Sequence, residues 1–188
     1  MIPARNPLLH IYDASDLSID STAAIRRLWS APQNIHRVPV YGYVDLLDKL
    51  NELVRDGREY PRALFETHGS SGAIYFGNDK INANMMKHNF AGKGYDRIFP
   101  YLWSRIYFNG CNVADDPDGW DFLDAAGSVF LRRGGGIVFA QTEVGRPIVL
   151  PAGHVHHFGA TTAYSVWMPG GYFAGHQEDG PHRCRQAS

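Results

Sequence analysis

Two short segments share one design, an apolar stretch that stops at a reactive side chain. Residues 63–69 read ALFETHG and end in His68 and Gly69, while residues 105–111 read RIYFNGC and end in Cys111. A free thiol has a pKa of about 8.5, so a neighbouring imidazole can raise its thiolate fraction or take its proton. The same imidazole can protonate a leaving amine, a role worth roughly 10²–10⁴ in rate. The pair therefore predicts acyl-transfer chemistry.

The glycine after the histidine fits the same chemistry. Gly69 has no Cβ, so its backbone N–H can approach a substrate carbonyl closely. Together with the N–H of Cys111 it would form an oxyanion hole, which typically supplies a few kcal/mol of transition-state stabilisation. We therefore expect Cys111, His68 and Gly69 to be the catalytic residues.

These groups must be brought together by the elements that precede them. Ligands bind at the carboxyl ends of strands in open parallel sheets, so two neighbouring strands would project His68 and Cys111 from one edge. Strands alternate with helical periodicity along the chain, which favours an α/β sandwich with a largely parallel sheet. The other expected strands are residues 8–12, 35–41, 73–76, 137–140, 148–150 and 163–168. The expected helices are residues 22–29, 44–54, 95–103 and a segment starting at Asp116 and Pro117.

Length and composition set the broad class. A chain of 188 residues with 44% apolar residues fits one globular domain, expected over residues 1–180 with a disordered tail at 181–188. The formal net charge is −1, so the chain lacks the excess of basic residues that is typical of nucleic-acid-binding proteins. No apolar stretch approaches the roughly 20 residues needed to cross a membrane, and no secretory segment opens the chain. Cytoplasmic location is the default expectation, although non-classical export would leave no trace in the sequence.

The two blocks together resemble the caspase-like cysteine peptidases of clan CD. In that group a hydrophobic block ends in His-Gly and a second one ends in the catalytic cysteine. The sequence GCNVA at residues 110–114 is similar to the motif around the catalytic cysteine in caspase-like domains of large bacterial surface proteins and toxins. The resemblance implies a caspase-haemoglobinase three-layer sandwich, with His68 and Cys111 as the dyad and Gly69 as an oxyanion donor. It implies a protein or peptide substrate, or self-cleavage, without any cofactor.

The same resemblance indicates a substrate pocket of unusual composition. Asn109 occupies the position where metacaspases carry an acid that binds basic side chains, and caspases have Gln-Ala before the nucleophile and Arg-Gly after it. Specificity for Arg, Lys or Asp is therefore not supported. A late strand walls this pocket in caspases, and residues 164–167 are its counterpart here. Asn109, Ser165 and Trp167 are thus the expected substrate-binding residues.

A histidine-rich stretch downstream raises the question of a metal. Residues 153–157 read GHVHH, and His154 and His156 would point to one face of a strand. Because no cysteine or acid stands at a recognised spacing beside them, we expect a loop and no metal site. The other cysteine, Cys184, is expected to be an exposed bystander.

Two other kinds of function are compatible with the same residues. A caspase-like fold could serve as a catalytically silent binding or scaffold module, with the His68–Cys111 pair intact in sequence but misaligned or occluded. Cys111 could also be only a small buried side chain. A cysteine-dependent amidase or deamidase would use the same dyad on a different bond. Nothing in the sequence sets the oligomeric state.

Overall fold

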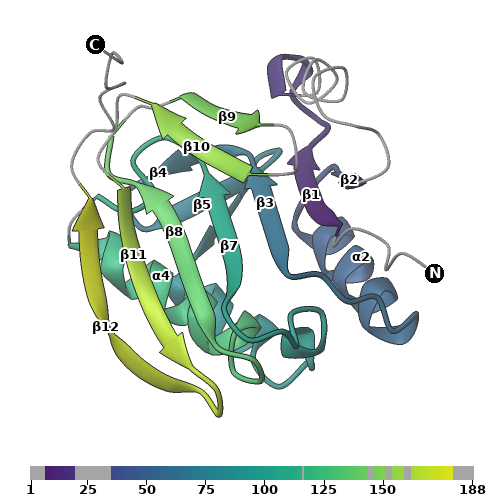
Figure 1. Ribbon diagram of the computed structural model, residues 1–188. Helices are drawn as coiled ribbons and strands as arrows, with labels where there is room; N and C mark the ends of the chain where they lie inside the picture. The colour runs from purple at the N-terminus through teal and green to yellow at the C-terminus, as the bar shows by residue number, and fades with distance from the viewer. Residues whose placement is uncertain are drawn as a thin grey trace.

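The computed structural model describes residues 7–19, 35–115, 117–143, 146–150, 154–158 and 162–179. They form an α/β protein with a mixed, mostly parallel seven-stranded sheet (Figure 1). Its strands, in the order in which they lie side by side, are β12 (Tyr172–Asp179), β11 (Thr162–Met168), β8 (Gly136–Gln141), β7 (Ser104–Asn109), β3 (Arg62–Glu66), β1 (Leu8–Asp13) and β2 (Ile35–Val40). The five strands from β8 to β2 are parallel, whereas β11 pairs antiparallel with β8 and β12 pairs antiparallel with β11. The predicted α/β class and largely parallel sheet are confirmed.

Two smaller antiparallel sheets accompany the large one. β4 (His68–Ser70), β5 (Ala73–Phe76) and β6 (Asp79–Asn82) follow directly after β3, and β9 (Arg146–Leu150) pairs with β10 (His154–Phe158). The turn from β5 to β6 places Gly77 at φ +59°, a backbone conformation that glycine adopts at no steric cost. The turn residues Gly-Asn-Asp thus produce the hairpin expected after residues 73–76.

Two helices cover one face of the large sheet. In α2 (Tyr43–Arg55) the leucines at 46, 50 and 53 are buried, and α4 (Asp118–Phe130) buries Phe122, Leu123 and Phe130. These side chains form one cluster with Phe65 and Phe108 of the central strands. The apolar faces of the two helices repeat every 3.6 residues and pack on alternate residues of the strands, and this packing builds the main core.

The opposite face of the sheet carries a second, smaller apolar group. Leu8, Leu64 and Tyr107 are buried there, next to the half-buried Phe139, whose ring stacks on Tyr107 with centroids 4.7 Å apart. Within the described part of the chain, this group draws only on strand residues.

One predicted helix is wrong and another is shifted. Residues 95–103 contain only a single 3₁₀ turn, η3 (Tyr95–Arg97), because Pro100 lacks an N–H and disfavours helical backbone at the residue before it. The helix expected from Asp116 and Pro117 begins at Asp118, with Pro117 at the N-cap and no side-chain cap. Residues 22–29 and Asp116 lie outside the described residues. Two further short helical elements are α3 (Ala83–Met85) and η2 (Met86–Phe90).

No helix of the described segments is both long enough and apolar enough to cross a bilayer.

Candidate active site

Three neighbouring strands end at the same edge of the large sheet and carry the candidate catalytic groups. Glu66 of β3 pairs with Tyr12 of β1 and with Asn109 of β7, so the three strands end level with one another. His68 and Cys111 each follow two residues after those paired positions. The chain passes from β1 to β2 on one side and then to β3 on the other, so this edge contains a topological switch point. Ligands bind at such points in open α/β sheets.

The segments that bear His68 and Cys111 are in direct backbone contact. A Cβ added at Gly69 would lie 2.8 Å from the carbonyl oxygen of Cys111 and 2.9 Å from the carbonyl carbon of Gly110. A Cβ added at Gly110 would lie 2.9 Å from the Cα of Gly69. The backbone N–H of Thr67 donates to the carbonyl of Asn109 at 3.1 Å. Both glycines are therefore needed for the close approach, and the structure brings these two segments together.

The loop after β7 is held from both sides. The N–H of Gly72 in the β4–β5 turn donates to the carbonyl of Val113 at 3.0 Å, and the N–H of Ala114 donates to the carbonyl of Gln141 at 2.9 Å. Asn112, next to Cys111, has φ +60°, a left-handed conformation that Asn tolerates better than most residues. Cys111 itself is half-buried and forms no disulfide. The thiol thus sits on a loop with a fixed backbone.

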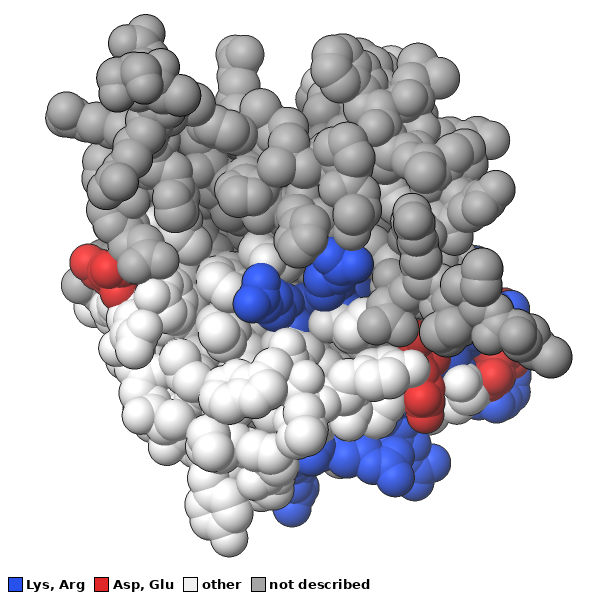
Figure 2. All heavy atoms as spheres, in the orientation of Figure 1, with Lys and Arg blue, Asp and Glu red and all other residues white. Residues whose placement is uncertain are grey.

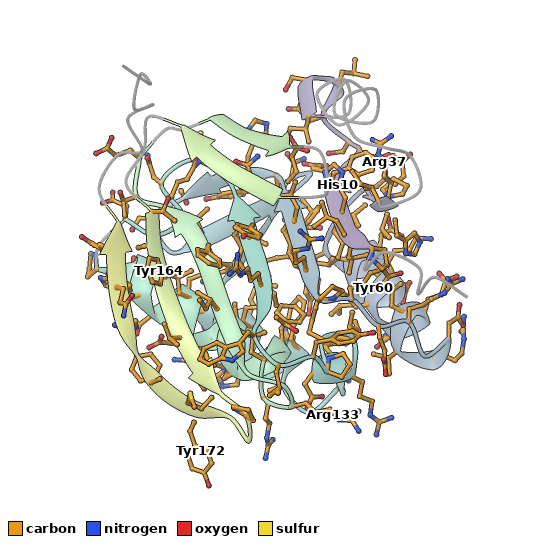
Figure 3. The ribbon with its side chains drawn as sticks, in the orientation of Figure 1. His10, Arg37, Tyr60, Arg133, Tyr164 and Tyr172 are labelled. Atoms are coloured by element: carbon orange, nitrogen blue, oxygen red, sulfur yellow. The ribbon has the colours of Figure 1, made fainter. Side chains whose placement is uncertain are left out.

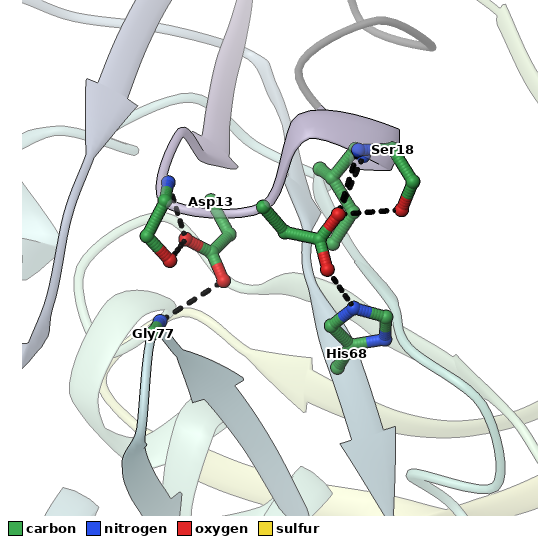
Figure 4. A network of polar contacts seen from close by, with 7 residues as sticks. Asp13, Ser18, His68 and Gly77 are labelled. Atoms are coloured by element: carbon green, nitrogen blue, oxygen red, sulfur yellow. Dashed lines mark hydrogen bonds and ion pairs between the residues drawn. The ribbon is translucent and has the colours of Figure 1, made fainter.

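His68 has an acidic partner that follows the end of β1. Its Nε2 lies 2.8 Å from Oδ2 of Asp16, and the two side chains are 57% and 34% exposed (Figure 4). Hydrogen bonds from the hydroxyl of Ser18, then from His68 and from the Ser18 backbone, hold the pKa of Asp16 far below its usual value. Asp16 is therefore a carboxylate at neutral pH. It stabilises the tautomer of His68 that carries its proton on Nε2 and leaves Nδ1 as an acceptor.

A second carboxylate fixes the loop that presents Asp16. Oδ1 of Asp13 accepts the hydroxyl of Ser15 at 2.6 Å, and Oδ2 accepts the N–H of Gly77 at 2.9 Å (Figure 4). The end of β1 is thereby tied to the β5–β6 turn. Asp16 was not among the residues predicted from the sequence, where only the strand at residues 8–12 was expected in this region. The available signal was an acid placed just after the first strand of a parallel sheet.

Asn109 lies beside a buried hydrogen-bonded pair, Glu66 and His10. Its cross-strand neighbour Glu66 bonds through Oε2 to Nε2 of His10 at 2.8 Å, with both side chains almost fully buried (Figure 3). Asn109 itself is half-buried at the end of β7, one residue before the turn that carries Cys111. Of the three expected substrate-binding residues, it is thus the one that lies next to the segment bearing Cys111.

Ser165 and Trp167 lie elsewhere. The expected late strand exists as β11, but Ser165 is fully buried and its hydroxyl donates to Asp124 of α4 at 2.9 Å. Trp167 donates from Nε1 to Oγ of Ser165 at 2.8 Å and pairs with Gly136, at the opposite end of β8 from the Cys111 edge. His176 bonds the same carboxylate at 2.8 Å. The structure therefore does not bring Ser165 and Trp167 to the dyad, and their polar groups serve a network against α4.

The histidine-rich stretch was expected to form a loop, but residues His154–Phe158 form strand β10. The side chains of this strand lie outside the described ones, as does Cys184. Among the side chains that the structure describes, no three His, Cys, Asp or Glu residues are grouped so as to hold a metal ion.

Comparisons with family models, curated proteins and solved structures give no match for this chain. The functional argument consequently rests on the geometry of the Asp16, His68 and Cys111 edge.

Proposed function

We propose that this chain is a cysteine-dependent peptidase of the caspase-like type, with Cys111 as nucleophile and His68 as general acid and base. The observation that carries the proposal is the placement of Asp16, His68 and Cys111 after three adjacent parallel strands, β1, β3 and β7. A base oriented by a third group beside a nucleophile is the arrangement that activates thiols and hydroxyls in hydrolases.

The reaction would run as two acyl transfers. The Cys111 thiol gives its proton to Nδ1 of His68, and the sulfur attacks the carbonyl carbon of the substrate to form a tetrahedral oxyanion. Backbone N–H groups of Gly69 and Cys111 stabilise that oxyanion. The C–N bond then breaks, His68 protonates the leaving amine, and an acyl-thioester remains on Cys111. Water, deprotonated by His68, attacks the thioester and releases the acid and the free thiol.

Asp16 acts through His68 and is a positioning residue. Its carboxylate accepts the Nε2 proton, which fixes the ring orientation and stabilises the imidazolium formed in each transfer. Because Ser18 and His68 keep its pKa low, the carboxylate keeps this role across the neutral range.

We also propose that the fold is of the caspase-haemoglobinase type. Four features support a caspase-haemoglobinase-like domain over residues 1–180: a parallel core in the order β2-β1-β3-β7-β8, His-Gly after β3, cysteine after β7, and a helix between β7 and β8. A protein or peptide is the proposed substrate, and this chemistry requires no metal or organic cofactor.

A cleavage assay tests the proposal. A mixture of proteome-derived peptides is incubated with the wild type, Cys111→Ala and His68→Ala, and the products are identified by mass spectrometry. New termini that appear with the wild type and are lost in both variants support a peptidase. Deamidation without chain cleavage would replace it with an amidase, and unchanged peptides would favour a silent binding module.

A further inference from the structure

A basic hollow lies at the other end of the sheet, where the strands begin. Its volume is about 400 Å³, and it opens between the segment around η3 and the carboxyl end of α4. Three arginines from these two segments line it, Arg97 on one side and Arg132 and Arg133 on the other. Basic side chains gather at this lower end of the molecule in Figure 2, and Figure 3 labels Arg133 there. Arg97 lies far from Arg132 and Arg133 in the chain, so the cluster forms only in the folded protein.

The three guanidinium groups have no protein partner in the described structure. None of them forms an ion pair or a side-chain hydrogen bond there, whereas other cations such as Lys49 and Arg55 do pair with carboxylates. An unpaired guanidinium keeps five N–H donors available in a fixed fork that matches the oxygens of phosphate or carboxylate.

The residues that line the hollow carry a positive net charge, although the whole chain does not. Asp96 is the only acid that lines the hollow, so three arginines against one aspartate leave a formal charge of +2, compared with −1 for the whole chain. The carboxyl end of α4 contributes about −0.5 charge from its helix dipole, which offsets only part of this excess. The hollow thus favours an anion.

The backbone around the hollow is fixed before any ligand binds. The ring of Tyr95 stacks against that of Phe130 at a centroid distance of 6.3 Å, which holds η3 to the end of α4. The carbonyl of Arg132 accepts the N–H of Gly170 at 2.9 Å, and the N–H of Arg97 donates to the carbonyl of Gly94 at 3.0 Å. Such preorganisation lowers the ordering cost of binding.

We propose that this hollow, defined by Arg97, Arg132 and Arg133, binds a small phosphorylated anion such as a diphosphate or a phosphomonoester. Charge-assisted hydrogen bonds from two segments would grip the phosphate oxygens. The site is separate from the dyad edge, so it stands whether or not Cys111 is catalytic.

Isothermal titration with inorganic pyrophosphate in a metal-free, low-salt buffer tests the proposal on the full chain. Arg132→Gln/Arg133→Gln should weaken binding by at least about tenfold, because each lost charge-assisted bond is typically worth that factor. Lys80→Gln/Arg55→Gln removes the same charge from exposed positions outside the hollow and should change affinity by no more than about twofold. Asp96→Asn should tighten binding, which no loss of folding can imitate.

Two results would overturn the assignment. The first is no measurable binding of pyrophosphate to the wild type. The second is equal weakening in the two double variants, because that would show a response to net charge alone. Thermal unfolding of each variant confirms that the compared proteins are folded.

Discussion

Oδ2 of Asp16 lies 2.8 Å from Nε2 of His68, across a separation of 52 positions in the chain. The contact exists because β1 and β3 are hydrogen-bonded neighbours whose ends meet at one edge of the sheet. It gives the candidate base a negatively charged partner on the side away from the proposed proton transfer. The first prediction concerns this contact.

Asp16→Asn should slow covalent labelling of Cys111 by at least about tenfold, since an amide can neither stabilise the imidazolium nor fix the correct tautomer. The rate is measured with an electrophilic peptide ketone by intact mass. Ser18→Ala is the matched control. It removes the largest cause of the low Asp16 pKa, but an ordinary aspartate is still ionised at pH 7, so the rate should stay within about threefold. Equal rates in Asp16→Asn and wild type would remove Asp16 from the mechanism.

Gly69→Ala should separate the two segments that carry the dyad. The new methyl group would lie 2.5 Å from Cγ2 of Val113 and 2.8 Å from the carbonyl oxygen of Cys111, and backbone atoms cannot move aside without displacing the loop. We expect a loss of about 1–3 kcal/mol in the free energy of unfolding, measured with urea, and slower Cys111 labelling. Gly57→Ala, at φ +63° with open space around it, should cost stability by backbone strain and leave labelling unchanged.

Ser165→Ala should affect stability and leave probe preference unchanged. The serine oxygen accepts from Trp167 and its hydroxyl donates to Asp124, so its removal leaves a buried indole N–H without its acceptor. The expected loss in the free energy of unfolding is about 1–3 kcal/mol. A changed ranking of peptide probes at normal stability would instead restore the predicted substrate-binding role of Ser165.

His36 should make stability depend on pH. Burial, and to a lesser extent the charge of Arg58, lowers its pKa below the usual 6.5, while Glu52 opposes this effect. The unfolded chain therefore binds the proton more readily, so the contribution of His36 to stability is fully present above pH 6.5. That contribution falls as the pH drops below 6.5 towards the folded pKa. His36→Gln should flatten the decline in unfolding free energy between pH 7.5 and 5.5, and an unchanged slope would contradict this.

Sequence patterns predicted the elements of this site better than its contacts. Apolar runs ending at glycine placed His68 and Cys111 after β3 and β7, because buried parallel strands and tight turns leave a local signature. The pairing of His68 with Asp16 has no local signature. It depends on which strands become neighbours, and the sequence alone does not fix the strand order.

For β11, too, the sequence predicted the strand but not the contacts of its side chains. The strand was correctly predicted from its alternating pattern, but the period of two does not say which face packs on a helix. Ser165 and Trp167 turned out to face α4. The basic hollow likewise joins Arg97 to Arg132 and Arg133 only through the packing of η3 on α4.

The most direct test of an activated dyad is the labelling rate of Cys111 relative to that of Cys184 in the same molecule. An electrophilic peptide-ketone library is applied to wild type, His68→Ala and Cys111→Ala, and the adducts are mapped by mass spectrometry. The account predicts that Cys111 reacts faster than Cys184 by at least about tenfold, and that His68→Ala abolishes this difference. Equal rates at the two cysteines, indifferent to His68, would contradict the account and indicate a binding module.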